Sequence, residues 1–258
     1  MTYAIMQTGP EPPSAEQFQN AFEQVPGLTA GDAKLMAKDA CGMLIKGLDL
    51  EQASAMKSAM ASQGLETEAV EESALRELPL AKQLRRVEFT TEALEMDDLL
   101  GHIVPLEWND ILLIAAGHVR CTVFTTTMVD EIVSYADNDS MPRVAMTSKT
   151  KEAQADHWLL EIITREGAVR YRAVADWPET VLLFQCLGQR RTRDTAANFA
   201  ALVKDLATSA PTAVLNHGAY CLCENPDPSF FYPSQTAFYR EITWLLWMIS
   251  SGRMQAGD

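Results

Sequence analysis

Three residues with metal-binding side chains occur close together late in the sequence: His217, Cys221 and Cys223. Imidazole nitrogen and thiolate sulfur are common ligands of Zn²⁺ in proteins. If residues 213–223 form a strand, residues of the same parity share a face, and all three side chains lie on it. A structural zinc site usually takes four ligands, however, and the sequence has no second cysteine pair to supply them. Because alternate cysteines in an apolar strand are commonly small buried side chains, we expect a strand here without a bound metal.

The densest basic cluster consists of Arg190, Arg191 and Arg193, at the start of a helix predicted over 192–209. Backbone N–H groups at a helix N-terminus attract anions. Guanidinium groups bind phosphate and carboxylate through paired hydrogen bonds. The sequence leaves two interpretations: a ligand-binding site at these arginines, or neutralisation of neighbouring carboxylates in an acidic protein.

Three histidines, His102, His118 and His157, are candidates for a general base. None lies beside a serine or cysteine in a nucleophile pattern, and the sequence contains no known phosphate-binding, dinucleotide-binding or metalloprotease motif. Since His118 follows a predicted strand and His157 begins one, we expect strand-end or core positions for them. The sequence therefore favours a protein without enzymatic activity or cofactor, although catalytic groups can converge from distant positions.

A helix predicted over 234–248 is apolar on nearly all sides. A helix of this kind is either buried between domains or offered to a partner. Its residues Trp244, Trp247 and Met248 are therefore a candidate interaction surface. A homodimer formed through this helix is one arrangement that would cover them.

The N-terminal segment contains clear sequence signals for the starts and ends of its helices and strands. Residues 3–72 predict the order strand, helix, helix, strand, helix, strand. Two capping boxes mark helix starts, Ser14 with Gln17 and Asp49 with Gln52. The pattern predicts a small α+β domain.

This segment resembles the C-terminal domain of the bacterial ribosomal stalk protein, whose fold is similar to that of the Clp-protease adaptor. The resemblance lies in VPGLTAGDAKLMAKDA and IKGLDLEQASAMKSAMASQGLETEAVE, with a Gly27-Leu28 turn, a turn led by Gly47 and an alanine-rich helix ending at Gly64. The stalk domain meets translation factors through a lysine-rich helical surface. Of such a surface this sequence has only Lys34 and Lys38.

Beyond a linker at 73–82, the periodicity changes to short apolar runs. Ile111 to Ala116 is continuously apolar, as in a strand covered on both faces. The polar stretch 125–156 predicts a long insertion or flexible loop. Short strands followed by one amphipathic helix, with VEFTTEALEM and VPLEWNDILLI, resemble bacterial pleckstrin-homology-like domains over 83–208. The two halves together are similar to a group of uncharacterised bacterial proteins. This resemblance does not indicate any particular activity.

The composition limits the classes of function. The chain has 258 residues, 47% of them apolar, and a formal net charge of −14. This charge argues against nonspecific nucleic-acid binding and against docking on an anionic membrane. The longest strongly apolar run, 242–249, is far shorter than a membrane span. Five cysteines without a disulfide framework, and a start that lacks signal-peptide features, predict a cytoplasmic location.

The sequence thus predicts an α+β fold class: a small βααβαβ domain (1–74), an antiparallel pleckstrin-homology-like barrel (83–208) and a C-terminal extension with an apolar helix (211–258). The leading hypothesis for function is a non-enzymatic interaction or scaffold protein with an unidentified protein partner. The alternative is a protein that binds a small molecule or phosphate through the three arginines. A hydrolase with dispersed catalytic residues is the third hypothesis.

Overall fold

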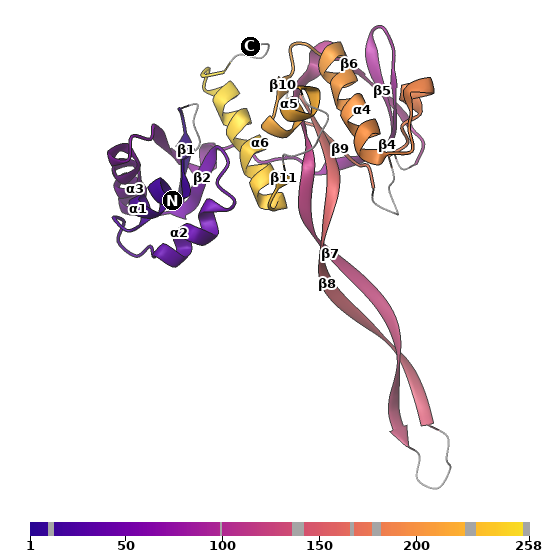
Figure 1. Ribbon diagram of the computed structural model, residues 1–258, viewed down its shortest axis with the longest axis horizontal. Coiled ribbons are helices and arrows are strands. Elements are labelled where there is room, and N and C mark those ends of the chain that lie inside the picture. Colours follow the sequence, from indigo (N-terminus) through magenta and orange to yellow (C-terminus); the bar gives the residue numbers. More distant parts are fainter. Residues whose placement is uncertain are drawn as a thin grey trace.

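The chain builds two β-sheets on opposite sides of its last helix (Figure 1). The computed structural model describes residues 1–9, 13–98, 100–135, 142–165, 168–176, 182–224 and 231–254. Strands and helices occur in both parts, so the predicted α+β class is confirmed. Among the described residues, no helix is long and apolar enough to cross a membrane.

The N-terminal unit has an antiparallel sheet of three strands in the order β2-β1-β3. Its elements are β1 (Tyr3–Gln7), α1 (Ala15–Phe22), α2 (Ala30–Ala37), β2 (Met43–Leu48), α3 (Leu50–Ser62) and β3 (Thr67–Glu71). This order confirms the prediction for 3–72. Because strand side chains alternate between faces, Ile5 and Ile45 pack with the helices, while Ala4 and Met6 face the other way.

Local hydrogen bonds fix the helix starts of this unit. The Ser14 hydroxyl accepts from the Gln17 N–H, and the Gln17 side chain accepts from the Ser14 N–H. Asp49 and Gln52 form the same reciprocal pair, so both predicted capping boxes are confirmed. Gly64 has φ +77°, the left-handed conformation that commonly ends a helix.

The second sheet has eight strands in the order β10-β7-β8-β9-β4-β5-β6, and β11 also pairs with β7. The strands are β4 (Ala81–Phe89), β5 (Ala93–Asp98), β6 (Ile103–Glu107), β7 (Ile111–Tyr135), β8 (Pro142–Thr164), β9 (Arg170–Val174), β10 (Val214–Leu215) and β11 (Phe231–Tyr232). Short 3₁₀ helices lie at η1 (Glu72–Ala74), η2 (Trp108–Asp110) and η3 (Gln185–Arg190).

The antiparallel pleckstrin-homology-like barrel predicted for 83–208 is not confirmed, because the described strands form no closed barrel. The sheet is open, with β10 and β6 at its ends, and β4–β9, β10–β7 and β11–β7 are parallel pairs. The physical reason lies partly in the C-terminal residues. Strands β10 and β11 come from 211–258 and occupy the edge of β7, so the C-terminal segment is built into this sheet.

Three helices cover the second sheet: α4 (Thr195–Ser209), α5 (His217–Glu224) and α6 (Gln235–Ser250). Helices α4 and α5 pack on one face, where Phe199, Leu202 and Leu222 meet Ile114 and Leu160. Helix α6 covers the other face. The prediction that Ile111 to Ala116 is a strand covered on both faces is confirmed, because its residues contribute to both core clusters.

Helix α6 also covers the N-terminal sheet, so it is buried from two sides. Its residues Trp247 and Met248 share a core cluster with apolar residues of β1, β2 and β3: Ala4, Met6, Met43 and Val70. The Trp244 indole N–H donates to the carbonyl of Gln7 at 2.7 Å. Gly42, with φ +68°, lets this ring approach, because a Cβ there would lie 2.2 Å from the Trp244 ring.

Strands β7 and β8 form a hairpin far longer than the rest of the sheet. They pair from Ile111↔Thr164 out to Tyr135↔Pro142. In Figure 1 the outer part of this hairpin projects away from the body as a two-stranded ribbon. The insertion or flexible loop predicted for 125–156 is therefore wrong for the described residues, which are strand. The frequent Thr, Val and Ile residues of this stretch favour an extended backbone. The loop was predicted because many of the other residues of the stretch are polar.

Candidate functional site

The structure separates the three arginines of the predicted ligand site. Arg190 ends η3 and is held by Asp205 of α4, with hydrogen bonds of 3.0 and 2.5 Å between the guanidinium and the two carboxylate oxygens. Charge neutralisation is therefore the observed role of Arg190. Arg191 and Arg193 instead line a cleft of about 560 Å³ at the start of α4.

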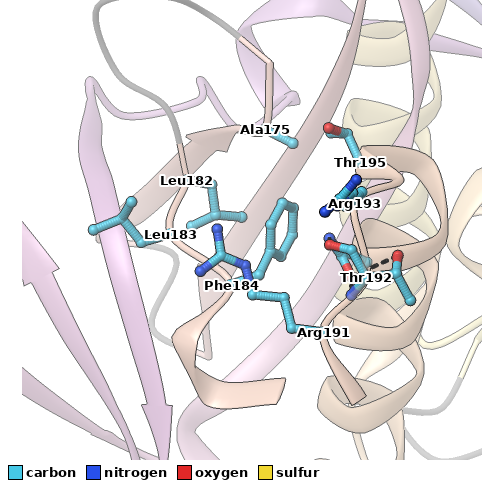
Figure 2. Close-up of a pocket in the computed structure, with 9 residues that line it drawn as sticks. Ala175, Leu182, Leu183, Phe184, Arg191, Thr192, Arg193 and Thr195 are labelled. Atoms are coloured by element: carbon cyan, nitrogen blue, oxygen red, sulfur yellow. Dashed lines mark hydrogen bonds between the residues drawn. The ribbon is translucent and has the colours of Figure 1, made fainter. Parts of the chain in front are cut away.

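The cleft has an apolar side and a polar side. Ala175, Leu182 and Phe184 are buried and form the apolar side. Figure 2 shows Arg191 extending toward Phe184, while Arg193 lies beside Thr195 on the helix side. Such a combination of apolar surface and a few convergent polar groups is typical of small-molecule sites.

A buried amide holds the polar side in place. The Asn198 side chain is 4% exposed. Its oxygen accepts from the Thr192 N–H at 2.8 Å, and its nitrogen donates to the Thr192 carbonyl at 2.9 Å. Asp194 then caps α4 by accepting from the Ala196 N–H at 2.9 Å. The hydrogen bonds of Asn198 and Asp194 thus hold the segment that carries Arg191 and Arg193 against the start of α4.

The strand predicted for 213–223 is wrong beyond its first residues, because 217–224 is helix α5. Asn216 is the signal that the sequence interpretation overlooked: its side chain accepts from the Ala219 N–H at 3.0 Å, as an N-cap does. The helix places Cys221 Sγ 3.5 Å from His217 Nε2, and Cys223 packs toward the sheet core. Burial raises the pKa of both thiols.

Metal ligation finds no further support in this region. Among the described residues, no group of three or more His, Cys, Asp or Glu side chains could hold a metal ion. The five cysteines are all free thiols.

Two of the three candidate histidines lie on paired strands, and the third lies apart from them. His118 lies inside β7, not after it, and stacks on Trp158 with ring centroids 4.4 Å apart. Burial lowers the pKa of His118, which favours the neutral ring. His157 lies inside β8 with Nδ1 3.3 Å from the Asp176 carboxylate. His102 lies in the turn before β6, far along the sheet from the other two.

Two buried polar clusters were not predicted from the sequence. In the first, the Tyr232 hydroxyl donates to the Glu241 carboxylate and accepts from Asn216 Nδ2 at 2.8 Å and from the Gly218 N–H at 3.0 Å. Burial, reinforced by Glu241, raises the pKa of Tyr232 well above its ordinary value. The cluster joins α6, β11 and α5, and its groups satisfy one another, so it is a structural connection.

The second cluster surrounds Glu161 on β8, which is fully buried. Arg172 Nε donates to its carboxylate at 2.7 Å, and the Tyr239 hydroxyl donates to it at 2.7 Å. Burial raises the pKa of Tyr239 far above its ordinary value, so this hydroxyl stays protonated. The cluster ties α6 to β8 and β9.

The candidate interaction residues of the last helix are covered by the chain itself. Trp247 and Met248 are 8% and 7% exposed, and Trp244 is partly buried against both sheets. These side chains form an internal contact between the N-terminal unit and the second sheet.

The outer β7–β8 hairpin, which we call the arm, comprises 122–135 and 142–154. Strand β7 has β10 and β11 as neighbours only up to Val119, and β8 has β9 as a neighbour only from Leu159. Among the described strands, none other pairs with the arm. The arm therefore presents both of its outer edges to further strands, a property that no short motif in the sequence signals.

The chain matches no protein-family model, and comparisons with curated proteins and with solved structures find no significant match either. The geometry of the chain's own residues is therefore the basis for a function.

Proposed function

We propose that this chain is a non-enzymatic protein–protein interaction protein and that the arm makes the contact. One observation supports the proposal above all: within the described chain, the arm strands have only each other as neighbours. A two-stranded hairpin is marginally stable in water, and three or more strands are needed for independent stability. The edges of such a ribbon are templates for strand addition by another chain.

The partner that fits best is a second copy of this chain. Two identical arms that pair antiparallel about a two-fold axis make the same contact on both copies, which closes the assembly as a dimer. Pairing turns two ribbons into one four-stranded sheet. It also replaces water at one edge of each arm with ladder hydrogen bonds.

Removal of the arm tests the proposal. Since Val123 and Ala153 are paired in register, residues 124–152 can be replaced by Asn-Gly, a two-residue turn that suits a hairpin. Light scattering coupled to size exclusion should give a dimer for the full chain and a monomer for the shortened chain. A monomeric full chain at tens of micromolar would reject self-association, and a shortened chain that remains dimeric would place the interface elsewhere.

A further inference from the structure

We infer that the cleft at the start of α4 binds a small organic phosphate, with Arg191 and Arg193 holding the phosphate group. This binding site is independent of the arm and of the interaction function proposed above. The inference rests on cations without acidic partners, on a fixed backbone that presents them, and on the size and apolar side of the cleft.

The charge of the cleft differs from that of the chain. Many arginines of this acidic protein are neutralised by carboxylates, among them Arg86, Arg120, Arg172, Arg190 and Arg253. In the part of the chain that the structure describes, neither the Arg191 nor the Arg193 guanidinium forms an ion pair or hydrogen bond. Two guanidinium groups left uncompensated at one cleft match the charge of a phosphate dianion.

The acidic groups of the same segment make their printed contacts elsewhere than with Arg191 and Arg193. Asp194 is turned to its own helix, where it caps the Ala196 N–H. Asp205 is engaged by Arg190. The net charge of −14 repels anions at long range, but salt screens such repulsion beyond about 8 Å at physiological ionic strength. Among the described residues that line the cleft, Arg191 and Arg193 are the only charged side chains.

The backbone that carries the arginines is fixed before any ligand arrives. The buried Asn198 amide holds Thr192, the residue between them, through bonds to its N–H and its carbonyl. A ligand that meets a fixed turn loses less entropy on binding than one that must order it. The Thr195 hydroxyl, which lines the same cleft, adds a donor for a phosphate oxygen.

The size of the cleft favours a ligand larger than inorganic phosphate. A volume of about 560 Å³ falls in the range of small-molecule sites. The side formed by Ala175, Leu182 and Phe184 offers apolar surface next to the arginines (Figure 2). An organic phosphate with a ring or short apolar group would bury that group on this side while its phosphate meets Arg191 and Arg193.

Calorimetric titration of the full chain with phenyl phosphate, inorganic phosphate and benzyl alcohol tests the inference. We expect phenyl phosphate to bind more tightly than either of the other two, because only it uses both sides of the cleft. The double variant R191Q/R193Q should bind phenyl phosphate at least tenfold more weakly. The matched control K46Q/K57Q removes two positive charges from exposed positions of the N-terminal unit, and its affinity should stay within twofold of the natural chain.

Three results would overturn the inference. The first is a natural chain that does not bind phenyl phosphate at millimolar concentration. The second is a double variant that binds as well as the natural chain. The third is a K46Q/K57Q variant that loses as much affinity as R191Q/R193Q, since that would show a general effect of charge and no site. Thermal unfolding of each variant verifies that the compared chains are folded.

Discussion

The two halves of the β7–β8 hairpin are the same pair of strands in opposite surroundings. In the inner half, Leu113, Ile114 and Ala115 are fully buried between α4 and α5 on one face and α6 on the other, and β10 and β9 extend the sheet on both sides. In the outer half, the described side chains of Thr122, Ser148 and Gln154 are exposed. The backbone ladder runs through both halves, with register shifts between Ile111 and Leu113 and between Ile132 and Ser134.

The difference shows that the ladder alone does not explain stability. Backbone hydrogen bonds are exchanged with water when a strand pair opens, so each adds only about 0.5–1.5 kcal/mol net. In the inner half, apolar burial and neighbouring strands supply the rest of the stability. The outer half has the ladder without that support, which is why a partner for it is the central functional proposal.

The largest expected effect comes from a cavity in the inner half. Ile114→Ala removes a fully buried side chain between β8 and α4 and should lower the free energy of unfolding by about 2–5 kcal/mol. Ile103→Ala is the matched control, because that side chain is 56% exposed, and it should change stability by less than about 1 kcal/mol. Urea unfolding followed by circular dichroism measures both. Equal losses of unfolding free energy in the two variants would contradict the expected difference between a buried and an exposed strand position.

The second effect concerns the polar cluster that attaches the C-terminal residues to β7. Tyr232→Phe keeps the ring but leaves the Glu241 carboxylate, the Asn216 amide and the Gly218 N–H short of a buried partner. We expect a loss of about 1–3 kcal/mol in the free energy of unfolding. Tyr220→Phe, at a side chain 55% exposed, should have almost no effect. A Tyr232→Phe variant as stable as the natural chain would show that the cluster is dispensable.

A smaller effect should mark the boundary between the two halves, where His118 lies. Burial lowers the pKa of His118, although Asp156 and Asp176 act in the opposite direction and His157 and Arg120 add to the lowering. As the pH falls below the ordinary histidine value of about 6.5, the unfolded chain takes up a proton that the folded chain resists. This contribution to stability is therefore complete above that pH and is lost as the pH falls toward the folded pKa.

The measurement is the melting temperature between pH 7.5 and 5. His118→Gln should flatten the decline on the acid side. An unchanged profile in His118→Gln would assign the decline to other groups.

The smallest effect on stability should come from removing the arm. Replacement of 124–152 by Asn-Gly leaves every strand of the body with its neighbours. We expect the unfolding free energy of the body, measured at a concentration where both chains are monomeric, to change by less than about 0.5 kcal/mol. A large loss would mean that the arm supports the body, and the contrast between the halves would not hold.

Sequence reasoning succeeded where the structure is decided locally. A capping box such as Asp49 with Gln52 involves residues three apart, and the continuous apolar run at 111–116 reports burial on both faces directly. It failed where the deciding partner is distant. The partner of Arg190 is Asp205, further along α4, and nothing near Arg190 in the sequence indicates it. Asn216 was a local signal for α5, but the alternation of Cys221 and Cys223 suggested a strand instead.

The arm shows a different limit. The composition shows that 125–156 is polar, but loops and solvent-exposed strands are both polar. Pairing over this length depends on the register set by the inner half, which sequence periodicity does not reveal. The same holds for the cleft, because Phe184, Asn198 and the two arginines come together only when η3 packs beside α4.

The position of α6 between the two sheets has a consequence for how the chain is made. Residues 1–74 are synthesised before α6, so the apolar face formed by Ala4, Met6, Met43 and Val70 stays uncovered until Trp247 and Met248 have been added. A nascent chain that has not yet reached α6 therefore exposes an apolar surface, and chaperones and proteases recognise such surfaces. Escape of the N-terminal unit from that recognition depends on the synthesis and docking of α6.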